Sequence, residues 1–297
     1  MTKPKRQHWV PRLYLSSFAT PETADLEDPY IWCFHKEAGE PFCTSIKNVA
    51  AETYLYSPLG QDGARSWEME DKLAGLESAI SPLWRALADD FVDLGHETSR
   101  KGIALFVATL FLRNPQRLED HRHLQNEVLV RLKDLEPTKL PLPTLQEQPQ
   151  PATNAGTNAD TDLVLRHGFV DHIRASGRRL AEQLMAKRWA VIYSVEPSFA
   201  TSDNPLMVTH EDQTLRGLDS LRGTLILPVS PTRVLMLDDS AEPPNAYYKA
   251  NPYTPGACNG LSMRHSLRFL LSSVQSDQIL AGIVAAGDRH EPPTAGV

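Results

Sequence analysis

The spacing of apolar and polar residues divides the chain into a helical middle and a strand-rich end. From about Ser66, apolar residues recur at steps of three and four, which places them on one face of a helix. These positions are Met69, Leu73, Leu76, Ile80, Leu83, Leu87 and Phe91. Pro82 is expected to bend this helix or to split it at Ser81, because proline removes a backbone hydrogen bond.

Further helices are expected on both sides of a proline-rich segment. One spans about 98–112, is apolar on nearly all sides, and resumes over 116–135 after Arg113-Asn114-Pro115. Another covers roughly 162–187. Between 137 and 160, five prolines and a run rich in asparagine show no apolar period. This composition predicts a flexible insertion.

Near Trp189 the apolar period changes from helical to strand-like. Strands are predicted at 189–195, 206–209, 224–227, 234–237 and 268–272, with a turn at 228–231 and a last helix near 277–285. An earlier aromatic strand is predicted at Tyr30–Phe34. Short strands, helices and further strands therefore follow one another in blocks. The pattern predicts an α+β fold with N-terminal short strands, a central helical block and a C-terminal, mainly antiparallel sheet, all in one domain, 1–297.

Composition and charge narrow the functional classes. The net charge of −7 argues against a protein that coats DNA, although a local basic cleft is compatible with it. Three cysteines without Cys-x-x-Cys spacing argue against a disulfide scaffold or a thiolate zinc site. The first residues do not resemble a secretory signal, and no stretch approaches the roughly 18–20 apolar residues of a membrane span. A cytoplasmic protein without membrane contact is expected.

Two polar motifs carry the candidate chemistry. The first is Gln7-His8-Trp9-Val10-Pro11, in which His8 could exchange a proton or bind a metal. Alternatively, its neighbours anchor the N-terminus and His8 makes one satisfying hydrogen bond. The second is Ser202-Asp203-Asn204-Pro205. Asp203 could ligate a cation or orient a base, but an Asx turn explains the same residues.

Two basic features allow similar alternatives. Arg113 lies where an apolar helix is interrupted, so it either pairs with a carboxylate, Glu77 or Asp203, or clamps an anionic ligand. The ion pair is favoured. The basic residues of 166–188 either pair with the acidic stretch 52–97 across a helix interface or form a strip for phosphate groups. Here, too, pairing is the default interpretation.

With these motifs the chain resembles a large, mainly bacterial family, domain of unknown function 4238. The resemblance rests on segments that occur in the family's order and cover nearly the whole chain. They are Gln7–Pro11, Tyr14-Leu15, Phe18, Lys47–Ala50, Tyr54, Leu76–Ala79, Arg113–Pro115, Trp189, Thr201–Pro205, Pro228–Pro231 and Asn259. The family name implies no activity.

Two functional hypotheses follow. In the first, the protein is a hydrolase of a phosphate ester or nucleic acid, similar to a nuclease or phosphodiesterase. His8 acts as base or metal ligand, Asp203 orients it or shares a divalent metal, and Arg113 clamps the anion, with Gln7 and Asn204 as further binding residues. This hypothesis requires His8 and Asp203 to lie within direct or one-water reach in a concave pocket.

In the second hypothesis, the protein is a non-catalytic binding or regulatory protein of a bacterial defence or toxin-immunity system. The motifs are then structural staples around a ligand pocket. The expected partner is a ligand of unknown identity that could bear phosphate. The sequence favours the enzyme weakly, because polar motifs from three distant segments invite convergence on one site.

Overall fold

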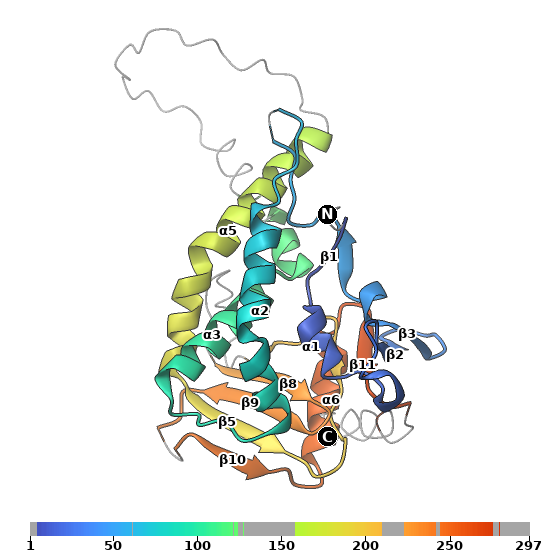
Figure 1. The fold of residues 1–297 in the computed structure, drawn as a ribbon, viewed down its shortest axis with the longest axis vertical. Coiled ribbons are helices and arrows are strands. Elements are labelled where there is room, and N and C mark those ends of the chain that lie inside the picture. Colours follow the sequence, from blue (N-terminus) through green and yellow to red (C-terminus); the bar gives the residue numbers. More distant parts are fainter. Residues whose placement is uncertain are drawn as a thin grey trace, which may run out of the picture.

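The computed structural model describes residues 5–60, 62–120, 122–123, 127, 158–209, 223–241, 244–275 and 279. A five-stranded sheet forms the base of the molecule, and helices stand on one of its faces (Figure 1). The strand order is β10 (Ala246–Lys249), β5 (Arg188–Tyr193), β9 (Arg233–Asp238), β8 (Thr224–Ser230) and β7 (Met207–Thr209). Neighbouring strands are antiparallel, except that β10 and β5 are parallel.

The helical layer consists of α2 (Glu68–Asp89), α3 (Glu97–Leu112) and α5 (Asn158–Ala186). The predicted apolar face of α2 is buried at Met69, Leu73, Ile80 and Leu87, and α3 is buried along most of its length. Gly102 lets α3 approach α2 closely, because a β-carbon there would lie 3.0 Å from Cδ1 of Ile80.

Two expectations for the helix predicted from Ser66, which is α2, need correction. Pro82 does not split α2, which continues through it to Asp89. The side chain of Pro82 is on the exposed face, where water can bind the carbonyl that lacks an amide partner. Phe91 follows the helix end instead of extending its buried face, and it is 63% exposed.

A four-stranded antiparallel sheet lies beside the helices (Figure 1). Its order is β3 (Phe42–Ser45), β2 (Tyr30–His35), β11 (Phe269–Ser272) and β6 (Thr201–Ser202). The helix α6 (Thr254–His265) packs on β6, β11 and β7. The short α1 (Arg12–Ser16) follows a two-stranded ribbon of β1 (Arg6–His8) and β4 (Ala51–Thr53), and 3-10 turns occur at Pro21–Thr23 and Ile46–Asn48.

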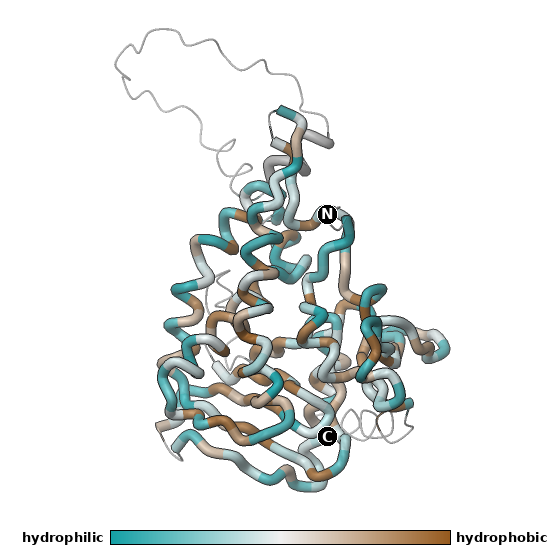
Figure 2. The backbone as a smooth tube through the Cα atoms, in the orientation of Figure 1, coloured by the Kyte–Doolittle hydropathy of each residue, from teal (hydrophilic) through white to brown (hydrophobic). Residues whose placement is uncertain are grey.

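One apolar core connects these layers. It includes Val10 near the start, Trp84 and Phe106 of the helices, Val191 of the five-stranded sheet and Leu271 of the four-stranded sheet. Hydrophobic stretches follow the interior helices and the strands at the base (Figure 2). The far face of the four-stranded sheet buries a smaller group made of Phe34, Ala200, Leu270 and Ile279. The first core therefore fixes the N-terminal motif segment relative to both sheets.

The predicted α+β class is confirmed, and so are most predicted strands. The turn expected at 228–231 is shorter, because β8 continues to Ser230 and only residues 231–232 turn. Residues 115–120 are helical as expected, but most of 121–135, the insertion up to 157 and most of 277–285 lie outside the described residues. No helix in the part that the structure describes is long and apolar enough to cross a membrane.

Candidate functional site

Gln7 is completely buried, and both ends of its side-chain amide are bonded to the segment after β4. Its Nε2 donates to Oγ of Ser57 at 2.6 Å, and its Oε1 accepts from the main-chain amide of Tyr56 at 2.7 Å. Because both polar atoms have protein partners, Gln7 holds the ribbon β1–β4 against the following segment.

His8 is partly buried at the end of β1. Its Nε2 lies 3.3 Å from the carbonyl oxygen of Ile46. Burial, together with the charges of Arg113, Arg12 and Arg6, lowers the pKa of His8 to about 4, against the opposite effect of the bond to Ile46. The imidazole is therefore neutral at neutral pH.

Trp9 connects the N-terminal motif to the second motif. Its indole Nε1 donates to the main-chain oxygen of Asp203 at 2.7 Å, and its own amide donates to Ala50 at 2.9 Å. The indole is buried, so this bond is shielded from water. Segments that are 194 positions apart in the chain thus meet through one tryptophan.

Arg113 is the C-cap of α3 and is 2% exposed. Its Nη1 pairs with Glu77 at 2.8 Å, which confirms the predicted ion pair. Nε donates to the carbonyl of Trp9 at 2.9 Å and Nη2 to that of His8 at 2.8 Å. All three guanidinium nitrogens therefore bind groups of this chain, which fasten the N-terminal motif to the helical layer.

Asp203 is 1% exposed, and its carboxyl group binds the backbone that leads into β11. Oδ1 accepts from the amide of Leu267 at 2.7 Å, and Oδ2 accepts from the amides of Arg268 at 2.8 Å and Phe269 at 3.3 Å. Burial raises the pKa of Asp203 and outweighs the opposite effect of these hydrogen bonds.

Asn204 joins α6 to the end of α3. Its Nδ2 donates to the carbonyl of His265 at 2.8 Å, and its Oδ1 accepts from Nδ2 of Asn114 at 2.7 Å. The main-chain amide of Asn204 donates to Oγ of Ser202 at 3.2 Å, so the side chain that accepts in this turn is that of Ser202 and not that of Asp203, from which an Asx turn was expected. The three motifs Gln7–Pro11, Arg113–Pro115 and Ser202–Pro205 therefore meet in the fold. We call the region where they meet the motif junction.

Two residues of the junction had no role in the sequence interpretation. The hydroxyl of Tyr14 bonds Oγ1 of Thr201 and donates to the carbonyl of Pro228, each at 2.6 Å. Asn259 of α6 accepts from the amide of Ala200 at 2.8 Å and donates to Ser198 at 3.0 Å. Both lie in segments that carried the family resemblance of the sequence, which is the signal that could have pointed to them.

The three motifs are joined mainly by hydrogen bonds to main-chain carbonyl groups. Arg113 binds the carbonyls of His8 and Trp9, and Trp9 binds the carbonyl of Asp203. The His8 ring bonds Ile46, whereas the Asp203 carboxyl group bonds 267–269, and no hydrogen bond joins the two side chains. A direct His8–Asp203 pair is absent, while a shared catalytic role for these residues stays a prediction.

Comparison with known proteins confirms the family resemblance. The sequence pattern of the family of proteins of unknown function DUF4238 matches residues 6–276. The chain belongs to this family. No curated protein and no solved structure matches it. The matched range contains every residue of the junction around Arg113 and Asp203.

The basic stretch of this DUF4238 protein pairs with acidic residues, as the default interpretation expected. Arg174 of α5 bonds Glu68 at 2.7 Å, and Arg166 bonds Glu52 at 3.0 Å. At the end of the stretch, Lys187 binds Asp239 at 2.8 Å and Arg188 binds Asp238. These pairs reduce the positive charge available to phosphate groups.

Metal and thiol chemistry have little support in the described residues. No group of three or more His, Cys, Asp or Glu side chains there could hold a metal ion. Cys33, Cys43 and Cys258 are all free, in agreement with the expectation of no disulfide scaffold. Burial raises the pKa of Cys33 and of Cys258 to about 12, so neither is a ready thiolate.

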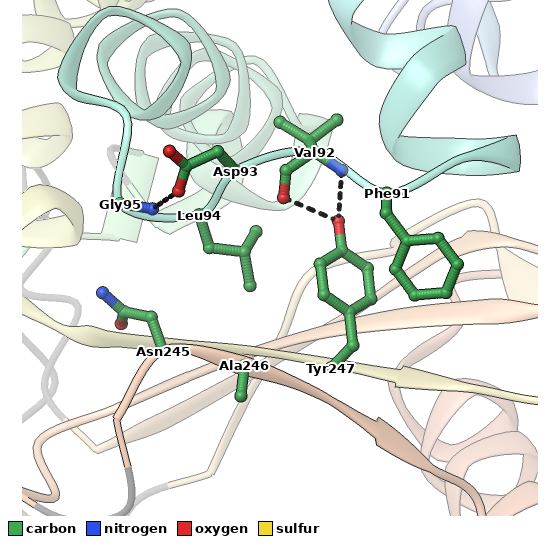
Figure 3. A pocket seen from close by; sticks show the side chains of 8 residues that line it. All are labelled: Phe91, Val92, Asp93, Leu94, Gly95, Asn245, Ala246 and Tyr247. Atoms are coloured by element: carbon green, nitrogen blue, oxygen red, sulfur yellow. Dashed lines mark hydrogen bonds between the residues drawn. The ribbon is translucent and has the colours of Figure 1, made fainter.

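A shallow pocket of about 350 Å³ lies elsewhere, between β10 and the connector of α2 and α3. Its walls are residues 91–95 and 245–247 (Figure 3). The connector precedes α3, whereas Arg113 follows it, and 16 helical residues span about 24 Å. The pocket and the motif junction are therefore separate regions.

Proposed function

We propose that this DUF4238 protein is a non-catalytic binding protein, in which the family motifs form a structural junction. The observation that supports this most is that Asp203 and Arg113, the two charged residues of the motifs, use their side-chain polar atoms in hydrogen bonds within the chain. The Asp203 carboxyl group accepts from three main-chain amides, and every guanidinium nitrogen of Arg113 donates within the chain. Groups bound in this way are poorly placed to take up a substrate.

The phosphate-directed hydrolase is the second candidate, and one observation favours it. His8 is neutral and partly exposed, and Arg113, Arg12 and Arg6 all influence it electrostatically. A neutral imidazole that donates from Nε2 to Ile46 keeps a lone pair on Nδ1, which could accept a proton or bind a metal. A nuclease, a phosphodiesterase and the defence setting stay predictions.

Asp203→Asn tests the junction role. The amide of asparagine cannot accept from all three main-chain donors, so unfolding should become easier by about 2–3 kcal/mol. Urea unfolding measures this loss. Asp62→Asn is the matched control, because Asp62 is exposed and, among the described residues, its carboxylate accepts from Ala64 alone, at 3.0 Å. Its stability should change by less than about 0.5 kcal/mol.

Activity assays separate the two candidates. Purified protein is given Mg²⁺, Mn²⁺ or Zn²⁺ and screened against DNA, RNA and a chromogenic phosphodiester, beside His8→Ala and Asp203→Asn. We expect no turnover that depends on either residue. A reaction that the wild type catalyses, and that His8→Ala loses while its melting temperature is unchanged, would refute the binding-protein proposal and support the hydrolase.

A further inference from the structure

The strand β10 has a free edge. In the described part of the chain, β5 is its only neighbour. The amide of Ala250, just after β10, donates to the carbonyl of Tyr193 at 2.7 Å, so even-numbered residues there direct their main-chain groups toward β5. Because these groups alternate along a strand, the amides and carbonyls of Tyr247 and Lys249 point away from the sheet.

This edge has only part of the usual protection against another strand. Natural edge strands are blunted by short length, lysine, proline or bulges, and β10 has the first two but not the last two. The segment Ala246-Tyr247-Tyr248-Lys249 has no proline, pairs with β5 in regular register and carries one charge. Its outward groups therefore form a regular template for an additional strand.

The pocket beside the edge has a rigid aromatic wall. The hydroxyl of Tyr247 accepts from the amide of Val92 at 2.8 Å and donates to its carbonyl at 3.1 Å (Figure 3). The ring of Phe91 lies 4.7 Å from that of Tyr247 and 6.0 Å from that of Tyr193. The guanidinium of Arg233 lies 5.3 Å from the centre of the Phe91 ring, but Phe91 is still 63% exposed, so the rest of its surface is open to a partner.

The connector above the edge is acidic. Residues 89–97 contain Asp89, Asp90, Asp93 and Glu97 but no lysine or arginine. Glu97 pairs with Lys101, and Asp93 uses one oxygen to accept from Gly95 at 2.8 Å. The neighbouring Arg233 is buried and donates to carbonyls at the end of α2. A basic partner therefore complements the rim of this pocket.

The geometry points to a docking site for an extended segment of a partner protein that carries lysine or arginine. The segment adds a strand to β10 and binds the outward groups of Tyr247 and Lys249. A basic side chain lays its aliphatic stem against Phe91 and Tyr247 and places its charge near Asp93. The inference rests on the proposed binding function and names the partner's chemistry.

A labelled peptide that alternates lysine and valine is the probe, with a peptide that alternates glutamate and valine as its charge-reversed control. Fluorescence polarisation measures the dissociation constant of each. The lysine peptide should bind with a dissociation constant of about 1–100 μM, and added salt should weaken it. The glutamate peptide should bind at least about tenfold more weakly.

Lys249→Pro tests strand addition. Proline removes the outward amide without removing a bond to β5, and edge strands tolerate it. Lys249→Ala is the matched control, since it removes the same charge and keeps the amide. We expect the proline variant to bind the lysine peptide about fivefold to tenfold more weakly than the alanine variant. Equal binding by the two would refute strand addition.

Phe91→Ala and Asp93→Asn test the pocket. Phe91→Ala should weaken binding about tenfold, because an aromatic anchor is lost, and Asp93→Asn about threefold at low salt. The controls are Phe42→Ala, an exposed aromatic residue on β3, and Asp62→Asn, which makes the same type of turn as Asp93. Both should stay within about twofold of wild type. Equal losses in variants and controls would refute a specific site.

The remaining outcomes are also decisive. Failure of the wild type to bind the lysine peptide overturns the docking site. A dimer in light scattering that Lys249→Pro converts to a monomer shows that a second copy occupies the edge, and this overturns the proposal of a different partner. These readouts are independent of the turnover assays, so peptide binding together with His8-dependent turnover would refute only the non-catalytic function.

Discussion

The imidazole of His8 lies at the end of β1, near Arg113, Arg12 and Arg6, and burial together with these charges lowers its pKa to about 4. In the unfolded chain a histidine has a pKa near 6.5. Between these values the unfolded state binds the proton more readily than the folded state does. His8 therefore makes folding less favourable as pH falls from about 6.5 to about 4, by at most about 3 kcal/mol.

His8→Gln should remove this pH dependence. Glutamine can still donate to the carbonyl of Ile46 but does not titrate. We expect the variant to lose less stability than the wild type between about pH 6.5 and pH 4, while the two proteins are similar above pH 7. Urea unfolding at a series of pH values measures the difference. Parallel curves for the two proteins would contradict the pKa assignment.

Protonation of Asp203 has the opposite effect on stability: it makes folding more favourable as the pH falls. Because burial raises its pKa, the folded state binds this proton more readily than the unfolded state. Asp238 contributes the usual acid loss, since the hydrogen bond from Arg188 lowers its pKa. Comparing His8→Gln with wild type cancels both contributions and isolates the histidine.

Each motif residue had two possible roles, and the observation that decides between them differs from residue to residue. For Arg113, the ion pair with Glu77 was predictable, because a buried guanidinium needs a carboxylate. For Asp203, an Asx turn was predicted, whereas its acceptor oxygens reach 267–269 across the sheet. That partner segment is more than 60 positions away and has no local signature.

Among the elements, α2 continues through Pro82 because its solvent face tolerates the lost hydrogen bond. Tertiary contacts of the buried face, including Trp84 against Tyr14 and Phe106, keep the helix in one piece. The C-terminal carbonyls of α2 are bound from the five-stranded sheet. Ser230 donates to Ala88 at 2.9 Å, and Arg233 donates to Leu87 at 3.2 Å.

Pro82→Ala should therefore stabilise the protein, by about 1–3 kcal/mol, because it restores an amide donor on an exposed face of a continuous helix. Gly75→Ala is a matched helix variant, since its new β-carbon has no atom within 4 Å, and it should gain about 0.5–1 kcal/mol. Thermal unfolding compares both with wild type. A loss of stability in Pro82→Ala alone would show that the proline relieves strain in α2.

The helix α6 was not predicted from the spacing of apolar residues. Its sequence, Thr254–His265, contains two glycines, a proline and an asparagine and has no apolar period. The helix forms because it fills the space between β6, β7 and β11, and its Asn259 and Ser262 bind Ala200. A segment whose helical structure depends on such contacts with other elements resembles a loop when its sequence is considered alone.

Across all layers, Arg100 joins elements that are distant in the chain. It is 8% exposed, and its hydrogen bonds within the described residues go to main-chain carbonyls. Nη1 donates to Leu94 at 2.9 Å, and Nη2 donates to the end of α5 at Met185 and Lys187, at 2.8 and 2.9 Å. Its guanidinium also covers the ring of Trp189 on β5 at 4.6 Å. Burial lowers the pKa of Arg100.

Arg100→Leu should cost about 3–4 kcal/mol, because it leaves three carbonyls without their donor and removes a helix C-terminal cation. Hydrogen exchange should become faster first in 94–104 and near 185–189, where the contacts are lost. Arg85→Ala, on the exposed side of α2, serves as control and should change stability by less than about 0.5 kcal/mol. Exchange that rises uniformly through the chain would contradict a local clamp.

Local periodicity determined the fold class and most elements, because helices and strands with one buried face carry that face in their own sequence. The five-stranded sheet was visible this way in β5, β8 and β9. The motifs also pointed to the family, and the segments that carry Trp9, Arg113 and Asp203 do lie together, since Arg113 bonds Trp9 and Trp9 bonds Asp203.

Only the tertiary structure decided what those residues bind. Whether Asp203 faces a ligand or a backbone depends on which segment folds over it, and the segment at 267–269 does so. The free edge of β10 likewise depends on sheet order, because β10 pairs with β5, whose residues lie 56 positions earlier in the chain, as in the pair of Ala246 with Ala190. Such contacts depend on how the layers pack together, and this packing cannot be predicted from any local stretch of residues.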